Sequence, residues 1–452
     1  MTGSEPSLQT APTSAFIKTL NKFVSIRPEE IRAALMACLY FFCLLTSYFI
    51  LRSIRDAIGA EAGITRLPYL FSYTFVATLL LNPLFSFLVS KLPVRRFIPI
   101  VYRFFVACLF VFAAVHRWYP EAVATWMVPV FWVWAAVFSL FVPSVFWGFM
   151  SDTFTGEQSK RLYGFIGVGG TLGALAGSAI TAALATKVGI SWLLLTSAVV
   201  LELGVQTVRR FPASFRTETR EREAQRAPIG GNSLAGFTGV MKSPYLLMIC
   251  LYMMLYTIGT TVLYLQQAEL VRTSFASQEA RASFNAKLDF AVQVLTILAQ
   301  IFVTGRVIKW LGVGITLAIL PLMSVLGFAS LGMWSSISLF VVFSVMRRAG
   351  NNAFASPGRE VLYTVVTPED KYKAKNLIDT FVDRTGDQLG AWGFAKLAAA
   401  GIAISTISYL AVPMSALWLG IAFWLGARHT KLMANDERIS IRPKSVPVPA
   451  PS

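Results

Sequence analysis

The chain has little charge, few histidines and few cysteines. Asp, Glu, Lys and Arg together make up 14% of the 452 residues, against roughly 25% in ordinary soluble domains. The two histidines, His116 and His429, fall at the ends of apolar runs, and the four cysteines have the spacing of neither a metal site nor a disulfide framework. These shortages argue against metal-dependent and histidine-based catalysis, and we predict no metal and no cofactor.

Long apolar runs take the place of charge. Apolar residues make up 55% of the chain, the mean hydropathy is +0.61, and many runs reach the roughly 20 residues that a helix needs to cross a bilayer. The polar start "MTGSEPSLQTAPTS" lacks the basic and apolar regions of a signal peptide. We therefore predict an all-α polytopic membrane protein embedded in a lipid bilayer.

The apolar runs predict twelve transmembrane helices in two pseudo-symmetric six-helix bundles. They lie near 33–51, 67–88, 97–115, 124–150, 163–186, 189–208, 245–268, 284–304, 311–332, 336–356, 375–398 and 402–427. The predicted organisation is a cytoplasmic N-terminus with an amphipathic helix at 15–27 (1–32), a first bundle (33–208), a cytoplasmic linker (209–243), a second bundle (244–427) and a cytoplasmic tail (428–452).

The net charge of +17 raises the question of a nucleic-acid partner. Its distribution argues against one, because the bases gather in alternate segments between the spans, as the positive-inside rule requires of cytoplasmic loops. We predict a multi-pass protein of the cell inner membrane with both termini in the cytoplasm, no nucleic-acid partner and a monomeric state.

The two predicted bundles repeat short motifs at corresponding positions. "FLVSKLPVRRFIPI" after the second span parallels "VTGRVIKWLGVGIT" after the eighth, and "TGEQSKRLYG" before the fifth parallels "TPEDKYKAKN" before the eleventh. Repeated halves around a central cavity are typical of major-facilitator-type transporters.

The fifth span contains glycines at every fourth position, Gly169, Gly173 and Gly177. Although Gly167 and Gly169 begin a pattern like a dinucleotide-binding loop, that motif needs a preceding strand and a soluble βαβ unit. The four-residue spacing instead predicts a smooth helix face that packs closely against another span.

The first span ends with Arg52, Arg55 and Asp56, and Arg52 and Asp56 stand four residues apart on one helix face. One interpretation is an interfacial anchor whose side chains reach water, and the other is a cationic wall of a central cavity. The turn after the fourth span holds Asp152, Glu157, Lys160 and Arg161, which we interpret as a cytoplasmic gate formed by ion pairs.

The tenth and eleventh spans carry unusually many polar residues. Arg347, Arg348, Asn351 and Asn352 interrupt the tenth; Asp379, Asp383 and Asp387 form a stripe on the eleventh beside Arg384, with Lys375 at its cytoplasmic entrance. Charges within a span are costly and persist where they pair or face water. The stretch predicts either an ion-pair lattice between the two helices or a solvated transport cavity.

Three segments resemble the nucleotide translocases of plastids and intracellular bacteria, the ATP/ADP-exchange type. They are "ILRSIRDAIG", "FWGFMSDTFTGEQSKRLYGFIG" and "SPGREVLYTVVTPEDKYKAKNLID". The resemblance implies essential bases at Arg55 and Lys375. It also points to the seventh span, where the family has an acidic residue and this chain has Tyr264, followed by Gln266 and Gln267.

The sequence thus predicts a secondary transporter, not an enzyme, for a small anionic solute such as a nucleotide or another phosphorylated metabolite, working by exchange or with proton coupling. Candidate solute-binding residues are Arg52, Arg55, Tyr264, Gln267, Arg347, Arg348, Asn351, Asn352, Lys375 and Arg384, and candidate coupling or gating residues are Asp56, Asp379, Asp383 and Asp387. The alternatives are a proton-coupled exporter of a metabolite, drug or siderophore, a membrane-embedded transferase, and a non-transporting scaffold.

Overall fold

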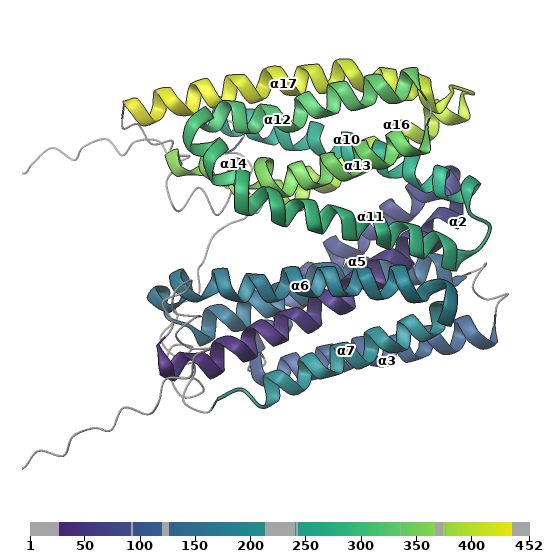
Figure 1. The fold of residues 1–452 in the computed structure, drawn as a ribbon, viewed down its shortest axis with the longest axis vertical. Coiled ribbons are helices and arrows are strands. Elements are labelled where there is room, and N and C mark those ends of the chain that lie inside the picture. The colour runs from purple at the N-terminus through teal and green to yellow at the C-terminus, as the bar shows by residue number, and fades with distance from the viewer. Residues whose placement is uncertain are drawn as a thin grey trace, which may run out of the picture.

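A computed structural model describes residues 27–91, 94–119, 126–212, 240, 243–334, 336–366, 374–375 and 377–435. The predicted amphipathic helix at 15–27 (apart from Arg27), most of the linker at 209–243 and the end of the chain lie outside these residues. The described chain forms two helical halves, one above the other in Figure 1.

The N-terminal half begins with a short 3₁₀ turn, η1 (Pro28–Glu30). Its helices are α2 (Ile31–Lys91), α3 (Val94–Trp118), α5 (Val128–Thr153), α6 (Gly156–Val188) and α7 (Ile190–Arg209). Helix α2 contains the first two predicted spans, which are separated at Gly63, where φ is +69°. A glycine suits this position because a side chain is strained in the left-handed region.

The C-terminal half contains π-helical turns as well as α-helices. Its elements are α10 (Pro244–Ser274), α11 (Gln278–Ala299), η3 (Gln300–Thr304), α12 (Gly305–Met333), α13 (Ile337–Gly350), η4 (Asn351–Ala355), α14 (Ser356–Leu362), η5 (Tyr363–Val365), η6 (Ile378–Val382), α16 (Asp383–Ala399) and α17 (Ile404–Ala434). Two of the π-turns, η4 and η6, fall within the polar tenth and eleventh spans, and single π-turns are frequent at functional sites.

The helices confirm the predicted fold class of twelve membrane-spanning segments. Nine helices of the described chain are long and apolar enough to cross a membrane, with α2 counted once. Dividing α2 at Gly63 adds a tenth, and the continuous helical stretches 337–362 and 378–399 supply the last two. These two are less apolar because they contain the charged residues singled out in the sequence.

The two halves use the same pairs of helices in their packing. In the N-terminal half α6 packs on α2 and α7 on α3, and in the C-terminal half α16 packs on α10 and α17 on α12. Each pair occupies corresponding places in the order of spans, fifth on first and sixth on third. The structure therefore has the pseudo-symmetry that the repeated motifs predicted.

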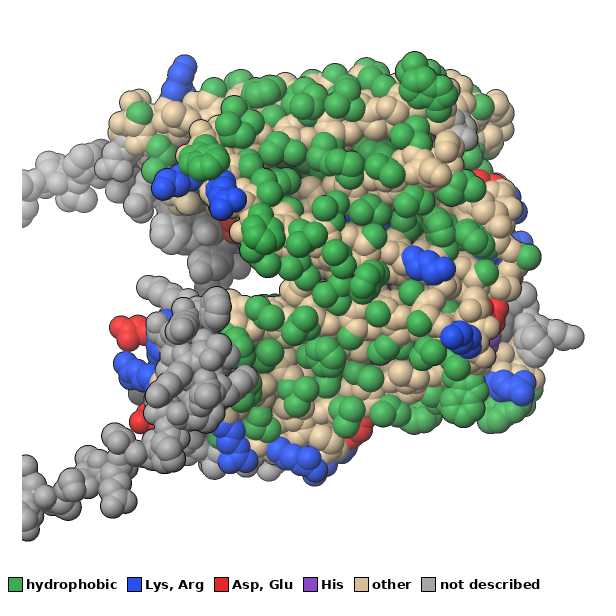
Figure 2. All heavy atoms as spheres, in the orientation of Figure 1, with side chains coloured by type: hydrophobic (Ala, Val, Ile, Leu, Met, Phe, Trp, Pro, Cys, Tyr) green, Lys and Arg blue, Asp and Glu red, His purple; other side chains and the backbone are tan. Residues whose placement is uncertain are grey.

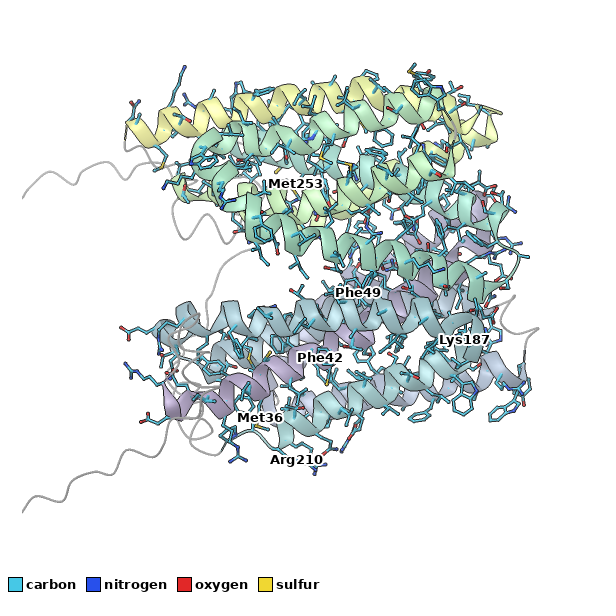
Figure 3. All side chains as sticks on the ribbon, in the orientation of Figure 1. Met36, Phe42, Phe49, Lys187, Arg210 and Met253 are labelled. Atoms are coloured by element: carbon cyan, nitrogen blue, oxygen red, sulfur yellow. The ribbon has the colours of Figure 1, made fainter. Side chains whose placement is uncertain are left out.

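The glycine stripe of α6 packs against the backbone of α2, as its spacing predicted. A Cβ on Gly169, Gly173 or Gly177 would collide with the carbonyl oxygens of Cys38, Phe42 and Thr46, respectively. Phe42 and Phe49 are labelled beside α6 in Figure 3. Only a residue without a side chain allows two helices to come this close.

The two halves meet at one end of the molecule and part at the other. We call the side where α2 begins and α17 ends the terminal face, at the left of Figure 1. Figure 2 shows a notch between the halves on this face, with hydrophobic side chains spread over the visible surface between the two ends and few charged ones among them. The opposite side, where Lys187 is labelled in Figure 3, we call the joined face.

Several hydrogen bonds between the halves lie toward the joined face. Gln278 of α11 contacts Glu61 of α2, and His116 Nε2 lies 3.2 Å from the Gln278 side-chain oxygen. The Ser283 hydroxyl donates to the carbonyl oxygen of Ala182 at 2.8 Å. Ser72 of α2 similarly donates to the side-chain oxygen of Gln388 on α16 at 2.8 Å. The described structure is thus open toward the terminal face and closed toward the joined face.

Candidate functional site

The first span is longer than predicted, and this changes the environment of its charged residues. The sequence places the end of the span near residue 51, whereas the helix continues to the Gly63 break. Asp56 lies seven residues, or about 10 Å, before that break. Asp56 is 7% exposed, and the side chains of Arg52 and Arg55 are 27% and 20% exposed. The interpretation as an interfacial anchor is therefore wrong for this cluster.

A cavity of about 230 Å³ lies between the two halves. Its described lining consists of Arg52, Asp56, Tyr256, Thr260, Leu263, Tyr264, Gln267, Val292, Gln293, Ser344, Arg347, Arg348, Asn351 and Asn352. Eight of the predicted site residues are among them. Guanidinium groups and side-chain amides provide many hydrogen-bond donors, so this lining suits an anion.

Asp289 of α11 joins two of the cavity's arginines across the halves. Its carboxylate forms an ion pair with Arg348 of α13, and its Oδ2 lies 3.6 Å from Arg52 Nε of α2. Asp289 is 2% exposed. Sequence reasoning missed this residue, although the signal was present: a carboxylate within the predicted span 284–304 is costly unless it has a partner.

Asp56 gathers groups from both halves as well. Its Oδ1 accepts hydrogen bonds from Arg55 Nη2 at 2.7 Å and from the Tyr264 hydroxyl at 3.1 Å. The guanidinium of Arg55 lies over the ring of Trp132, 5.0 Å from its centroid. Arg55 is therefore held beside the cavity by Asp56 and an aromatic face, while Tyr264 lies in the lining itself.

Arg347 is the most deeply buried of the cavity's arginines. It is 2% exposed, and it donates hydrogen bonds to the hydroxyls of Ser324 at 3.0 Å and Thr260 at 3.1 Å. A third, longer bond of 3.4 Å reaches the carbonyl oxygen of Tyr256. These acceptors are all neutral. They hold the guanidinium group of Arg347 in place but do not neutralise its positive charge.

The amide residues of the tenth span sit on a π-turn. Asn351 and Asn352 begin η4, and the Asn351 amide donates to the side-chain oxygen of Asn352 at 3.3 Å. Gln267 on α10 donates to the side-chain oxygen of Asn285 at 2.9 Å. Asn351 and Asn352 line the cavity together with Gln267, so amides from η4 and α10 face the same space.

The carboxylates of α16 lie in the contact between α16 and α10. Thr257 donates to Asp383 at 3.0 Å and Thr261 donates to Asp387 at 2.8 Å. Arg384 pairs with Asp387 at 3.2 Å. The side chain of Asp379 lies outside the described residues, and the π-turn η6 interrupts the regular spacing between Asp379 and Asp383.

Three predicted binding residues lie outside the described cavity lining. They are Arg55 and Arg384, described above, and Lys375, whose Nζ lies 2.5 Å from Glu360. The alternative prediction was an ion-pair lattice between the tenth and eleventh spans. Arg348 of the tenth span instead pairs with Asp289 of the eighth span. The roles of these residues in binding stay predictions.

The predicted gate residues surround the start of α6. Thr155 caps the helix through a reciprocal pair of hydrogen bonds with Gln158. Glu157, in the first turn of α6, is exposed. Arg161 forms an ion pair with Glu30 at 2.9 Å, joining α6 to the start of α2. Burial alone would raise the pKa of Glu30, but hydrogen bonds from Arg161 and from the Arg27 backbone lower it below its ordinary value.

Two gate residues are less defined. Asp152 lies on the last turn of α5 and is half-buried, whereas the side chain of Lys160 lies outside the described residues. The structure adds Glu30 to this group, and its place within one turn of the first span could not be read from the loop sequence alone.

The architecture and the cavity can be compared with known proteins. The family model of the Major Facilitator Superfamily matches residues 33–372. The chain belongs to this superfamily. It is therefore a multi-pass secondary transporter, in keeping with its paired bundles and central cavity.

Individual relatives agree with this assignment. The chain is 21% identical over 434 residues to ADP,ATP carrier protein 1 of Chlamydia pneumoniae, a match that covers 81% of this chain and 84% of the carrier. The solved nucleoside transporter NupG shares the fold with a TM-score of 0.60 at 14% identity, over 90% of this chain and 100% of its own. The D-xylose-proton symporter has a TM-score of 0.60 at 13% identity, over 87% and 97%. The resemblance to nucleotide translocases is thereby confirmed as a distant relationship.

Proposed function

We propose that this transporter moves a small anionic solute that carries phosphate, such as a nucleotide or a related phosphorylated metabolite. The observation that supports this most is the convergence of Arg52, Arg347 and Arg348 on one cavity. Guanidinium groups bind phosphate and carboxylate oxygens in a planar, bidentate manner. The relatedness to ADP,ATP carriers points to the same class of solute.

The residues that line the cavity also suit a solute with an aromatic or sugar portion. Tyr256 and Tyr264 supply ring faces, and Gln267, Asn351 and Asn352 supply amides that can donate and accept hydrogen bonds. Charged donors would hold the phosphate, and the aromatic and amide side chains would hold the remainder of the molecule.

We favour exchange of one solute for another over proton coupling. Asp383 and Asp387 are hydrogen-bonded to Thr257 and Thr261 between two helices, and they are absent from the described cavity lining. In this arrangement the two halves rock about the central cavity, with the terminal face toward the cytoplasm. The aspartates then hold α16 against α10 and do not carry protons.

Counterflow in proteoliposomes tests the proposal. Vesicles loaded with unlabelled ADP should accumulate labelled ATP, and vesicles without internal nucleotide should not. The Asp383→Asn variant should keep this exchange. An uptake that needs a pH gradient and disappears in Asp383→Asn would favour the proton-coupled exporter, and uptake of none of the tested phosphate-bearing anions would contradict the proposed function.

A further inference from the structure

Asp289 belongs to no motif recognised in the sequence, and the proposed function assigns it no role. It is buried at 2% exposure on α11, outside the described lining of the cavity, yet it pairs with two arginines that line it. One of these, Arg52, belongs to the N-terminal half, and the other, Arg348, to the C-terminal half. The carboxylate thus lies behind the anion-binding surface.

The charges around the cavity divide into three groups. Asp56 pairs with Arg55 at 2.7 Å and, at the longer distance of 4.0 Å, with Arg52. Arg52 and Arg348 share the single carboxylate of Asp289. Arg347 is hydrogen-bonded to neutral groups. Asp289 therefore cancels one positive charge of an otherwise strongly cationic wall.

The pairing with Asp289 leaves donors free for a solute. A guanidinium carries five N–H donors, and the ion pair between Arg52 Nε and Asp289 Oδ2, at 3.6 Å, is longer than a hydrogen bond. Both of these atoms are buried without a hydrogen-bond partner in the described structure. The carboxylate thus acts on Arg52 through its charge more than through occupation of its donors.

From this arrangement we infer that Asp289 is a specificity-determining residue that sets the negative charge of the solute that the cavity prefers. The inference rests on the proposed function. With Asp289 present, the wall suits a solute of moderate charge, and loss of its carboxylate makes more highly charged anions bind better. Asp289 does not touch the solute; it tunes the arginines that do.

The test uses two series of probes with constant chemistry and rising charge. Orthophosphate, pyrophosphate and tripolyphosphate form one series, and AMP, ADP and ATP form the other. Their affinities are measured for the full-length purified protein by competition against a labelled nucleotide. We expect Asp289→Asn to raise the affinity for tripolyphosphate relative to orthophosphate, and for ATP relative to AMP, by about tenfold or more over the wild-type ratios.

Two variants serve as controls for the shift. Asp289→Glu keeps the charge, so its ratios should stay near those of the wild type. Glu202→Gln removes a carboxylate that pairs with Arg103 between α3 and α7, outside the described cavity lining, and its ratios should be unchanged. A purely structural role for Asp289 would weaken all probes equally and leave both ratios as they are.

A second background guards against failure of Asp289→Asn to fold, because removing one partner of a buried ion pair is strongly destabilising. The second background is the Arg52→Gln variant, in which Asp289 has only Arg348 as a partner. Adding Asp289→Asn to it should again raise the affinity for the more highly charged probes relative to the less charged ones, by about tenfold compared with Arg52→Gln alone. Unchanged ratios in both backgrounds overturn the inference while the proposed function survives. Absence of binding of every probe to the wild type overturns both.

Discussion

Helix α6 crosses α2 with three glycines against backbone carbonyls, whereas α16 crosses α10 with two glycines and two carboxylates. Gly386 and Gly390 pack against the side chains of Thr257 and Thr261, and Asp383 and Asp387 accept hydrogen bonds from the same threonines. The two contacts occupy equivalent places in the two halves. One is held by close approach of the backbones, and the other by polar pairs as well.

The halves also contribute unequally to the cavity. Of the described lining residues, only Arg52 and Asp56 belong to the N-terminal half, and the others come from α10, α11, α13 and η4. The N-terminal half thus contributes one charged cluster to the described lining, and the C-terminal half provides most of the lining.

The strongest test of this contrast is Gly173→Leu in the contact between α6 and α2. The leucine side chain would collide with the backbone of Phe42, and we expect a loss of about 3 kcal/mol or more in stability, with little folded protein recovered. Thermal unfolding in detergent measures this. Gly167→Leu is the matched control, because a Cβ there meets no atom within 4 Å; equal damage in both variants would refute the close-packed contact.

Loss of a cavity arginine in the C-terminal half should mainly affect binding. Arg347→Ala removes a buried guanidinium, and we expect anion affinity to fall by about 2 kcal/mol or more, roughly thirtyfold, while the protein still inserts into the membrane. Competition binding and size-exclusion chromatography measure the two quantities. Arg103→Gln on the N-terminal half should leave affinity unchanged, and an equal loss there would argue against a localised site.

Thr261→Val probes the polar contact between α16 and α10. It removes the hydroxyl that donates to Asp387, and hydrogen bonds to charged groups contribute about 1.5–3 kcal/mol. The equivalent change in the N-terminal half, Thr46→Val, removes a hydroxyl that donates to the carbonyl oxygen of Phe42 at 2.8 Å and lies 3.2 Å from that of Gly173. Because both acceptors are neutral, this change should cost about 1 kcal/mol or less. Similar melting temperatures for the two variants would show that the carboxylates add nothing to this contact.

The smallest effect is expected at the ion pair between Glu30 and Arg161. Because the pKa of Glu30 is lowered in the folded state, its stabilisation is complete above pH 4.5 and is lost as the pH falls through the lower folded-state pKa. Glu30 is buried and Arg161 is partly exposed, and a glutamine can keep neutral hydrogen bonds in its place. Glu30→Gln should therefore lower the free energy of unfolding near neutral pH by about 1 kcal/mol, and the difference should vanish in acid. A difference that persists in acid would mean that the loss has another cause.

The sequence predicted the fold well because hydrophobic length and loop charge determine a membrane topology directly. The glycine spacing in the fifth span also predicted a close contact correctly. The site was harder to predict. Asp289 escaped attention because it is a single carboxylate in an apolar span, and its partners Arg52 and Arg348 are distant along the chain.

Local helix geometry explains the other differences. The first span continues past its last long apolar run because Arg52, Arg55 and Asp56 form ion pairs inside the protein, with Asp289 as a further partner of Arg52. A hydropathy count treats such a cluster of charges as the end of a span. The π-turns at Asn351–Ala355 and Ile378–Val382 are likewise not visible in a pattern based on 3.6 residues per turn.

The joined face gives an indication of how easily the transporter can change state. Its described contacts include hydrogen bonds from Gln278, Ser283 and Ser72 across the two halves, and each such bond is worth only about 0.5–1.5 kcal/mol because water can replace it. Reversing a population from 1:99 to 99:1 takes about 5.5 kcal/mol. The polar contacts of the joined face are therefore comparable in free energy to the difference that must be supplied to reverse which state predominates, and the packing of α11 against α2 and α6 adds to that difference.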